Sequence, residues 1–242
     1  MDTLWLVIPT YDEAATLPGL VRAVAVELEA LAPGDWRILV VDDNSPDGTG
    51  RIAEGLRPGL GGRLEVLHRP GKGGLGRAYL AGFRHVLAAG AGTVVQMDAD
   101  FSHDPAHLPA LLGALTAGAD VALGSRYVPG GRVEDWGPLR RWISRGGSVY
   151  ARAVLGVDVR DLTGGYKAHR RVVLEGIDLS SIRSEGYSFQ IELTYRALRA
   201  GFRVREVPIT FRDRPLGRSK MSSRIALEAA WLVPRLRGWS PG

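Results

Sequence analysis

Three aspartates lie close together in the segment VVQMDADFSHDP, directly after an apolar run. Carboxylates at such short spacing repel one another unless water screens them or a cation is shared between them. Hard cations such as Mg²⁺ and Mn²⁺ prefer carboxylate oxygens together with substrate phosphates. Asp98 and Asp100 are therefore candidate metal ligands that bridge a cation to a diphosphate, with solvated loop acids as the alternative. Asp104 stands before Pro105, and we interpret it as a helix cap.

Two more polar clusters follow apolar runs. In VVDDNSPDGT, a carboxylate at Asp43 can accept hydrogen bonds from ribose hydroxyls or a base edge. The same residues form turns readily, so we expect a turn over residues 44–49 and a binding role for Asp43. In PGKGGLGRA, a glycine-rich turn with Lys72 can present backbone N–H groups to an anion. A flexible turn explains this segment equally well, because the spacing of a Walker motif is missing.

The elements that must position these clusters alternate along the first half of the chain. The apolar runs are residues 4–9, 36–43, 63–69, 93–100 and 120–127, and the helical patterns are residues 13–31, 76–90 and 105–118. This alternation predicts an α/β fold with a mostly parallel central sheet and helices on both faces. Ligands bind beyond the carboxyl ends of the strands in such sheets. We therefore expect the polar clusters to line one edge.

The second half is less regular. We expect helices within residues 138–156 and 185–201, and a strand within residues 202–214. Residues 222–239 have an amphipathic pattern whose apolar part is far too short to cross a membrane but could lie on one. The sequence thus predicts one domain over residues 1–221 and a C-terminal, membrane-interfacial segment over residues 222–242.

The composition limits the chemistry and the partners. The 242 residues include no cysteine, which excludes disulfides, thiol nucleophiles and cysteine-ligated metals. The N-terminus has no pattern of a signal peptide, so we expect a cytoplasmic protein. The net charge of +5 is carried mostly by arginines, with clusters over residues 126–152 and 212–224. Such clusters suit phosphates, nucleic acid or an anionic membrane surface.

The motifs VIPTYDE, VVDDNSPDGT, GKGGLGRAYLAGF, MDADFSHDP, GSRY, DLTGGYKAHRR and EGYSFQIEL occur in the order seen in inverting family 2 glycosyltransferases. Over about residues 4–221 the chain most closely resembles the polyprenol (dolichol) phosphate mannose synthases. The resemblance implies a catalytic domain of the Rossmann-like GT-A fold. It also implies transfer of mannose from GDP-mannose to a polyprenyl phosphate with Mg²⁺ or Mn²⁺. Because the tail of such an acceptor is too apolar to reach the site through water, we expect the protein to bind peripherally to the cytoplasmic face of a membrane.

The resemblance also assigns residues. Those for the donor nucleotide sugar are Pro9, Tyr11, Glu13, Asp43, Asp98, Asp100, Arg214 and Lys220, to which we add Lys72 from the glycine-rich turn. Those for the metal are Asp98 and Asp100, and those for the acceptor phosphate are Arg126, Arg140 and Ser144. Asp100 and Arg126 are the expected catalytic residues. Ser102 stands where relatives often have glutamine, which leaves a third metal contact open. We expect Asp161, Gln190 and Glu192 to be structural or sugar-orienting, and His103 to be solvent-exposed.

The chemistry of such a transfer agrees with these residues. A phosphate monoester is anionic near neutral pH, so its attack needs no strong general base, and the protein's task is positioning and charge control. Arginines supply forked, permanently charged donors for the acceptor. Transfer from UDP-glucose or another nucleotide sugar is an alternative, and a basic nucleic-acid-binding module is a remote one. We expect no nucleic acid partner, and the sequence leaves open a small transmembrane partner subunit.

Overall fold

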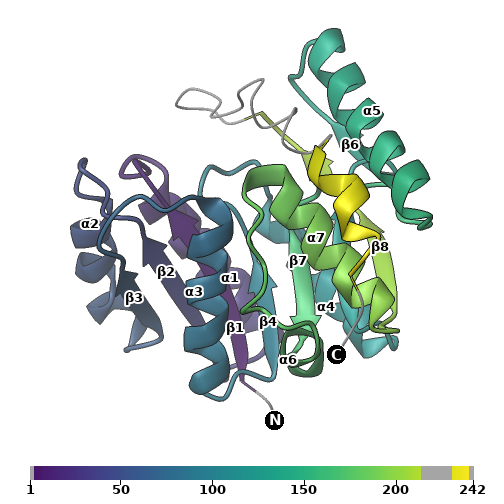
Figure 1. Ribbon diagram of the computed structural model, residues 1–242. Helices are drawn as coiled ribbons and strands as arrows, with labels where there is room; N and C mark the ends of the chain where they lie inside the picture. The colour runs from purple at the N-terminus through teal and green to yellow at the C-terminus, as the bar shows by residue number, and fades with distance from the viewer. Residues whose placement is uncertain (1–2, 214–230, 240–242) are drawn as a thin grey trace.

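A computed structural model describes residues 3–213 and 231–239. In this part of the chain, helices cover both faces of a seven-stranded sheet (Figure 1). In spatial order the strands are β3 (Leu64–His68), β2 (Trp36–Asp42), β1 (Leu4–Thr10), β4 (Thr93–Gln96), β7 (Lys167–Arg170), β5 (Val121–Ser125) and β8 (Val204–Pro208). All neighbouring strands are parallel except β7, which is antiparallel to both β4 and β5. The predicted α/β fold with a mostly parallel sheet is confirmed.

Both faces of the sheet are buried. The helices are α1 (Leu17–Leu31), α2 (Thr49–Leu56), α3 (Leu75–Ala88), α4 (Leu108–Thr116), α5 (Pro138–Leu155), α6 (Arg171–Gly176) and α7 (Gly186–Arg199), with short 3₁₀ turns at Pro58–Leu60 and Pro105–His107. On β1, Leu6 and Ile8 pack with α1 and α4 on one face, whereas Trp5 and Val7 pack with α3 and α7 on the other. Successive strand side chains point to opposite faces, which explains why the central strands are continuous apolar runs.

Several elements were not predicted from the sequence, among them β7 and α2. Strand β7 carries Lys167 and His169, which are both fully buried, so its pattern reads as polar although it lies between β4 and β5. Helix α2 follows the predicted turn after β2, and it is too short for its periodicity to stand out. Asp104 does cap the turn that precedes α4, because its side chain accepts the backbone N–H of Ala106 at 3.0 Å.

The second half adds a small layer beside the carboxyl edge of the sheet. Strands β6 (Arg132–Val133) and β9 (Thr210–Phe211) form a separate parallel pair, and α5 stands out from the body at the upper right of Figure 1. In the described C-terminal stretch, Val233 and Leu236 are buried with side chains of α5 and α7, whereas Trp231 is exposed. The division at residue 221 falls outside the described residues and stays a prediction.

Candidate active site

A cleft of about 450 Å³ lies at the carboxyl ends of β1, β2, β4 and β5. The predicted site residues that line it are Pro9, Tyr11, Glu13, Asp43, Lys72, Asp98, Asp100, Arg126 and Arg140. Ser144 is not among its lining residues, and the predicted donor contacts Arg214 and Lys220 lie outside the described residues. The strand-end clusters, which are far apart in the sequence, therefore do meet at one edge of the sheet, as parallel topology requires.

Hydroxyl groups hold the two aspartates that follow β4. The Tyr79 hydroxyl donates to Asp98 Oδ1 at 2.9 Å, and Ser102 donates to Asp100 Oδ1 from its hydroxyl at 2.6 Å and its backbone N–H at 3.1 Å. Burial raises the pKa of Tyr79, and the charges of Asp98 and Asp100 raise it further, so the phenol stays protonated and donates. The hydroxyl of Ser102, where the sequence left a metal contact open, orients Asp100.

The donor set of the cleft fits a hard divalent cation that binds together with a phosphate. Asp98 and Asp100 both line the cleft and offer carboxylate oxygens. Within residues 3–213 and 231–239, no group of three or more His, Cys, Asp or Glu side chains could hold a metal ion unaided. A cation such as Mg²⁺ keeps several waters and commonly takes one or two carboxylates plus substrate phosphates. The two aspartates therefore suit a cation whose coordination a bound diphosphate completes.

His103 is buried in the wall of the cleft, so the expectation of an exposed loop histidine was wrong. Its Nδ1 accepts the backbone N–H of Asp98 at 3.1 Å, and its ring stacks on Tyr166 with the centroids 5.0 Å apart. Burial lowers the pKa of His103 and outweighs the opposite effect of Asp98 and Asp100. The imidazole is thus neutral and fixes the backbone at the start of the aspartate loop.

Asp43 joins the end of β2 to the glycine-rich turn. Its carboxylate pairs with Arg69, a contact that the sequence did not indicate, and accepts the backbone N–H of Gly73 at 3.0 Å. Lys72 lies in the same turn, with its Nζ 3.8 Å from the centroid of the Tyr11 ring. This cation–π contact links the turn to the loop after β1. Three of the predicted donor contacts, Tyr11, Asp43 and Lys72, are therefore parts of one connected wall.

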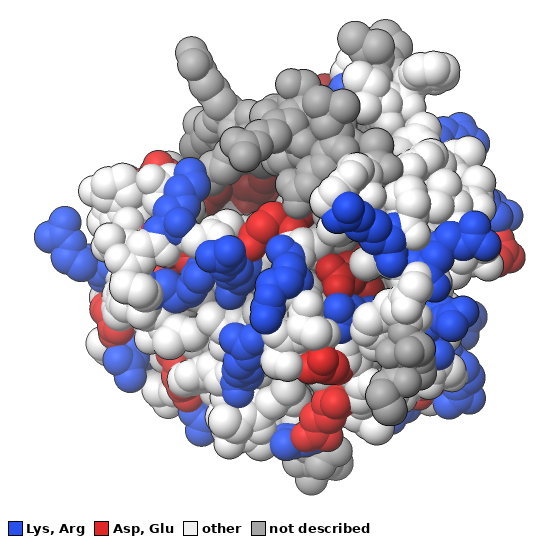
Figure 2. All heavy atoms as spheres, in the orientation of Figure 1, with Lys and Arg blue, Asp and Glu red and all other residues white. Residues whose placement is uncertain are grey.

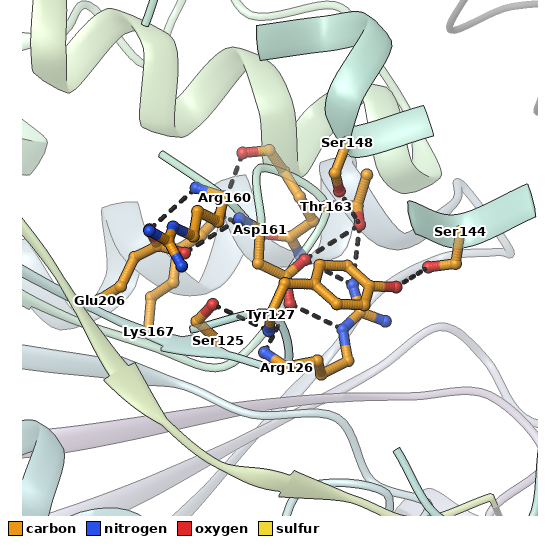
Figure 3. Close-up of polar contacts among 11 residues, drawn as sticks. Ser125, Arg126, Tyr127, Ser144, Ser148, Arg160, Asp161, Thr163, Lys167 and Glu206 are labelled. Atoms are coloured by element: carbon orange, nitrogen blue, oxygen red, sulfur yellow. Dashed lines mark hydrogen bonds and ion pairs between the residues drawn. The ribbon is translucent and has the colours of Figure 1, made fainter. Parts of the chain in front are cut away.

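Arg126, at the end of β5, is fixed by Asp161 (Figure 3). Asp161 is completely buried, and it accepts from Arg126 Nε at 2.7 Å, Nη2 at 2.6 Å and the backbone N–H at 2.9 Å. Burial by itself lowers the pKa of Arg126, but the charge and hydrogen bonds of Asp161 outweigh it and raise the pKa above its ordinary value. The guanidinium is therefore a permanent cation in a fixed orientation at the cleft.

The support of Arg126 extends to α5 and β8. Thr163 accepts from Arg126 Nη2 at 2.8 Å and lies 3.4 Å from the hydroxyl of Ser148, which reaches in from α5 (Figure 3). On the other side, the carboxylate of Glu206 in β8 accepts the backbone N–H groups of Arg160 and Asp161 at 2.8 and 2.9 Å. Glu206 thus holds the backbone of Asp161, and the side chain of Asp161 in turn holds Arg126.

The predicted acceptor residues on α5 are brought near the cleft in different ways. Arg140 lines the cleft and pairs with Asp213 at 2.6 Å, whereas the Ser144 hydroxyl accepts from the Tyr127 hydroxyl at 2.7 Å. Tyr127 directly follows Arg126, so Ser144 ties α5 to the end of β5. A clamp of Arg126 and Arg140 is consistent with this geometry, and a direct role of Ser144 toward a phosphate stays a prediction.

Residues at the start of α7 and within it form a part of the cleft that the sequence only partly indicated. Gln190 lines the cleft, and its Oε1 accepts from Lys167 Nζ at 2.7 Å and from Gln96 Nε2 at 2.8 Å. Glu185, which also lines the cleft, accepts the backbone N–H of Gly76 at 2.9 Å at the start of α3. The motif EGYSFQIEL signalled this region, but only the fold shows that Lys167 holds Gln190 from beneath.

The fold and the cleft at its strand ends are those of a nucleotide-sugar-dependent glycosyltransferase, and the sequence matches "Glycosyl transferase family 2" over residues 5–178. The chain belongs to this family. It is therefore a glycosyltransferase, and its α/β architecture is the GT-A fold that the sequence predicted.

The chain is also similar to individual proteins of known name. The chain is 51% identical, over 94% of its length and 84% of the relative's, to a polyprenol monophosphomannose synthase of Mycolicibacterium smegmatis. It is 47% identical, over 95% of its length and 91% of the relative's, to an undecaprenyl-phosphate mannosyltransferase of Micrococcus luteus. Among solved structures, a mannosyltransferase of Pyrobaculum calidifontis in complex with GDP-Man and Mn²⁺ has a TM-score of 0.66 and 16% identity, over 99% of this chain and 66% of the other. That last likeness concerns the fold alone.

Proposed function

We propose that this protein transfers mannose from GDP-mannose to the phosphate of a polyprenyl phosphate, with inversion at the anomeric carbon. The observation that carries the proposal is a single cleft lined by two aspartates suited to a cation–diphosphate group and by two arginines suited to a second phosphate. The names of the relatives at 51% and 47% identity support mannose and a polyprenyl phosphate acceptor. The solved mannosyltransferase in complex with GDP-Man and Mn²⁺ is consistent with this donor insofar as it has the same fold.

Asp98 and Asp100 would hold Mg²⁺ or Mn²⁺ together with the donor diphosphate. When bound, such a cation neutralises charge on the departing nucleotide. Tyr79 and Ser102 keep the two carboxylates oriented through the hydrogen bonds described above. We assign the donor nucleotide to the wall of the cleft that contains Pro9, Tyr11, Glu13, Asp43 and Lys72.

Arg126 and Arg140 would bind the acceptor phosphate. Two substrates that each carry phosphate repel one another, so cationic side chains must lie where the acceptor approaches. A phosphate oxygen is already a nucleophile, and the cleft then needs to orient it toward the anomeric carbon without removing a proton. Arg126 suits this task because Asp161 fixes its guanidinium, and we assign the catalytic roles to Asp100 and Arg126.

The test is formation of radiolabelled mannolipid from GDP-mannose and polyprenyl phosphate with Mn²⁺. The Asp100→Ala variant should lose roughly a hundredfold or more in rate, because a charge-stabilising group at the reacting phosphate is removed. Asp158→Ala is a matched control, since Asp158 is an exposed acid outside the cleft. Undiminished product from Asp100→Ala would contradict the metal role.

The donor is tested separately from the acceptor. Transfer from UDP-glucose is the alternative. A ligand that binds only the native state, at a concentration of a hundred times its dissociation constant, stabilises that state by about 2.7 kcal/mol. In the presence of Mn²⁺, GDP-mannose should therefore raise the melting temperature more than UDP-glucose does. The opposite order would favour a glucosyl donor.

A nucleic-acid-binding role finds less support. Figure 2 shows basic side chains that are spread over this face and interrupted by acidic and uncharged ones, without one continuous basic groove. The cleft itself contains Asp43, Asp98 and Asp100, which would repel a nucleic acid backbone. Salt-sensitive duplex binding in the absence of divalent metal would support this role instead.

We also propose that the protein binds peripherally to the cytoplasmic face of a membrane, through α5. No helix of the described residues is long and apolar enough to span a bilayer. On α5, Trp142, Ile143, Val149 and Tyr150 are exposed, with Trp142 at 79%, and heptad spacing places them in one stripe. Arg141 and Arg145 are exposed beside the stripe, and the helix contains no acid. Exposed aromatic and aliphatic side chains flanked by arginines suit an anionic lipid surface.

The docking helix is tested by sedimentation with vesicles that contain anionic lipid. The wild type should pellet with them, and a Trp142→Ser/Val149→Ser double variant should stay in the supernatant. Val26→Ser/Val172→Ser is a matched control, because these two valines are exposed on α1 and α6. Equal pelleting of all three proteins would remove α5 as the docking site.

A further inference from the structure

Trp136 lies between β6 and α5, where it contacts both arginines of the proposed acceptor clamp. Its ring centroid is 5.6 Å from Arg126 Cζ and 4.2 Å from Arg140 Cζ. The side chain is buried, at 4% exposure, and Trp136 does not line the cleft. Trp136 is therefore placed to act on the two arginines and not on a substrate.

The surroundings of Trp136 fix its ring. Phe211 of β9 packs edge-on against it, with the centroids 5.3 Å apart and the planes at 71°. The Phe211 centroid is also 5.3 Å from Arg126 Cζ, so the two aromatic rings and the Arg126 guanidinium form one cluster. The indole Nε1 is buried and has no hydrogen-bond partner in the part of the chain that the structure describes. The tryptophan at this position is therefore explained by the contacts of its ring with the two arginines and not by a hydrogen bond of its Nε1.

The Trp136 ring interacts favourably with two cations that repel one another. Two guanidinium groups repel one another, and the distances to the ring place the two Cζ atoms within about 10 Å of each other. The negative face of an aromatic ring attracts cations, and among the aromatic side chains this attraction is strongest for tryptophan. One ring in contact with both cations offsets their repulsion and limits how far either can move. Asp161 provides a counter-charge to Arg126 and Asp213 provides one to Arg140, and the Trp136 ring adds a contact that both arginines share.

We propose that Trp136 is a positioning residue that sets the spacing of Arg126 and Arg140, so that both donate to one acceptor phosphate. The inference rests on the proposed function, because it concerns the acceptor subsite of that reaction. It predicts that Trp136 governs the binding of the lipid phosphate and leaves the donor side of the cleft unaffected.

The test compares steady-state kinetics of the wild type, Trp136→Phe and Trp136→Leu with both substrates varied. The KM for polyprenyl phosphate should rise roughly tenfold in Trp136→Leu, which has no ring face, and by an intermediate factor in Trp136→Phe. The KM for GDP-mannose should stay within about twofold in both variants, because no donor contact is assigned to this ring. Trp36→Leu is the matched control: Trp36 is also buried and packs under an arginine, Arg63, but lies away from the cleft.

The outcomes separate this inference from the proposed function. A wild-type protein that makes no mannolipid would refute the proposed function. A wild type that turns over, with an unchanged acceptor KM in both Trp136 variants, would refute the positioning role alone. Equal increases of both KM values, or an acceptor effect reproduced by Trp36→Leu, would show a merely structural role. If Trp136→Leu does not fold, Trp136→Phe decides the question, since an unaltered acceptor KM there overturns the proposal.

Discussion

Replacing Asp161 by asparagine should destabilise the protein strongly, because it leaves the buried guanidinium of Arg126 without a counter-ion. The side chains of Arg126 and Asp161 are 4% and 0% exposed, so water cannot replace the lost charge. Asparagine has nearly the same shape, but its amide nitrogen would face an N–H donor of the guanidinium where a carboxylate oxygen now accepts. Removing one partner of a buried ion pair costs about 3 to 5 kcal/mol. That is a large part of the roughly 5 to 15 kcal/mol that stabilises a typical domain.

The assay for Asp161→Asn is urea unfolding followed by circular dichroism. The urea concentration at the midpoint should fall, whereas the slope of the unfolding free energy against urea concentration should stay unchanged. This combination indicates a change in stability and not in the compactness of either state. Asp158→Asn is the matched control, because Asp158 is 91% exposed in its pair with Arg152 and should change stability by less than about 1 kcal/mol. An Arg126→Met/Asp161→Leu double variant should recover part of the loss, since an apolar pair leaves no unpaired charge. A loss from Asp161→Asn as small as that of the control would refute the buried-pair reasoning.

Two further changes test the interior. Burial lowers the pKa of Lys167 to about 7. Between about pH 7 and pH 10, the unfolded chain therefore binds a proton at this lysine that the folded chain lacks. The unfolding free energy should rise with pH in this window, by up to about 1.4 kcal/mol per pH unit. Lys167→Met should abolish that slope in urea titrations from pH 7 to 9.5, and an unchanged slope would assign it to other groups. Gly76→Ala should lower the unfolding free energy by about 1 to 3 kcal/mol in the same assay, because a Cβ would lie 2.6 Å from the backbone oxygen of Ser184. Gly55→Ala is the control: Gly55 is exposed on a helix with open space around it, so this change should be neutral or stabilising. Equal effects of the two substitutions would contradict the packing argument.

Much of the site could be predicted because the end of a buried strand has a recognisable sequence pattern. Apolar runs that stop at Asp43 or Asp98 fix both the strand and its polar terminus, and parallel order then brings these residues to one edge. The partners of those residues could not be predicted in the same way. Arg69 and Asp161 are single charged residues among many, and nothing in the local pattern shows that Arg69 pairs with Asp43 or that Asp161 is the buried counter-ion of Arg126.

The α/β alternation, the order of the strand-end motifs and the family to which they belong could all be predicted from the amino-acid sequence, because periodicity and motif spacing are local properties of the chain. Three other features become visible only in the folded chain. Strand β7 enters the sheet antiparallel, with buried Lys167 donating to Gln190, His103 is neutral and enclosed, and Trp136 contacts two arginines from different elements. These features depend on contacts between residues far apart in the chain. Burial and charge pairing act through space, and a linear pattern does not record which distant groups will share that space.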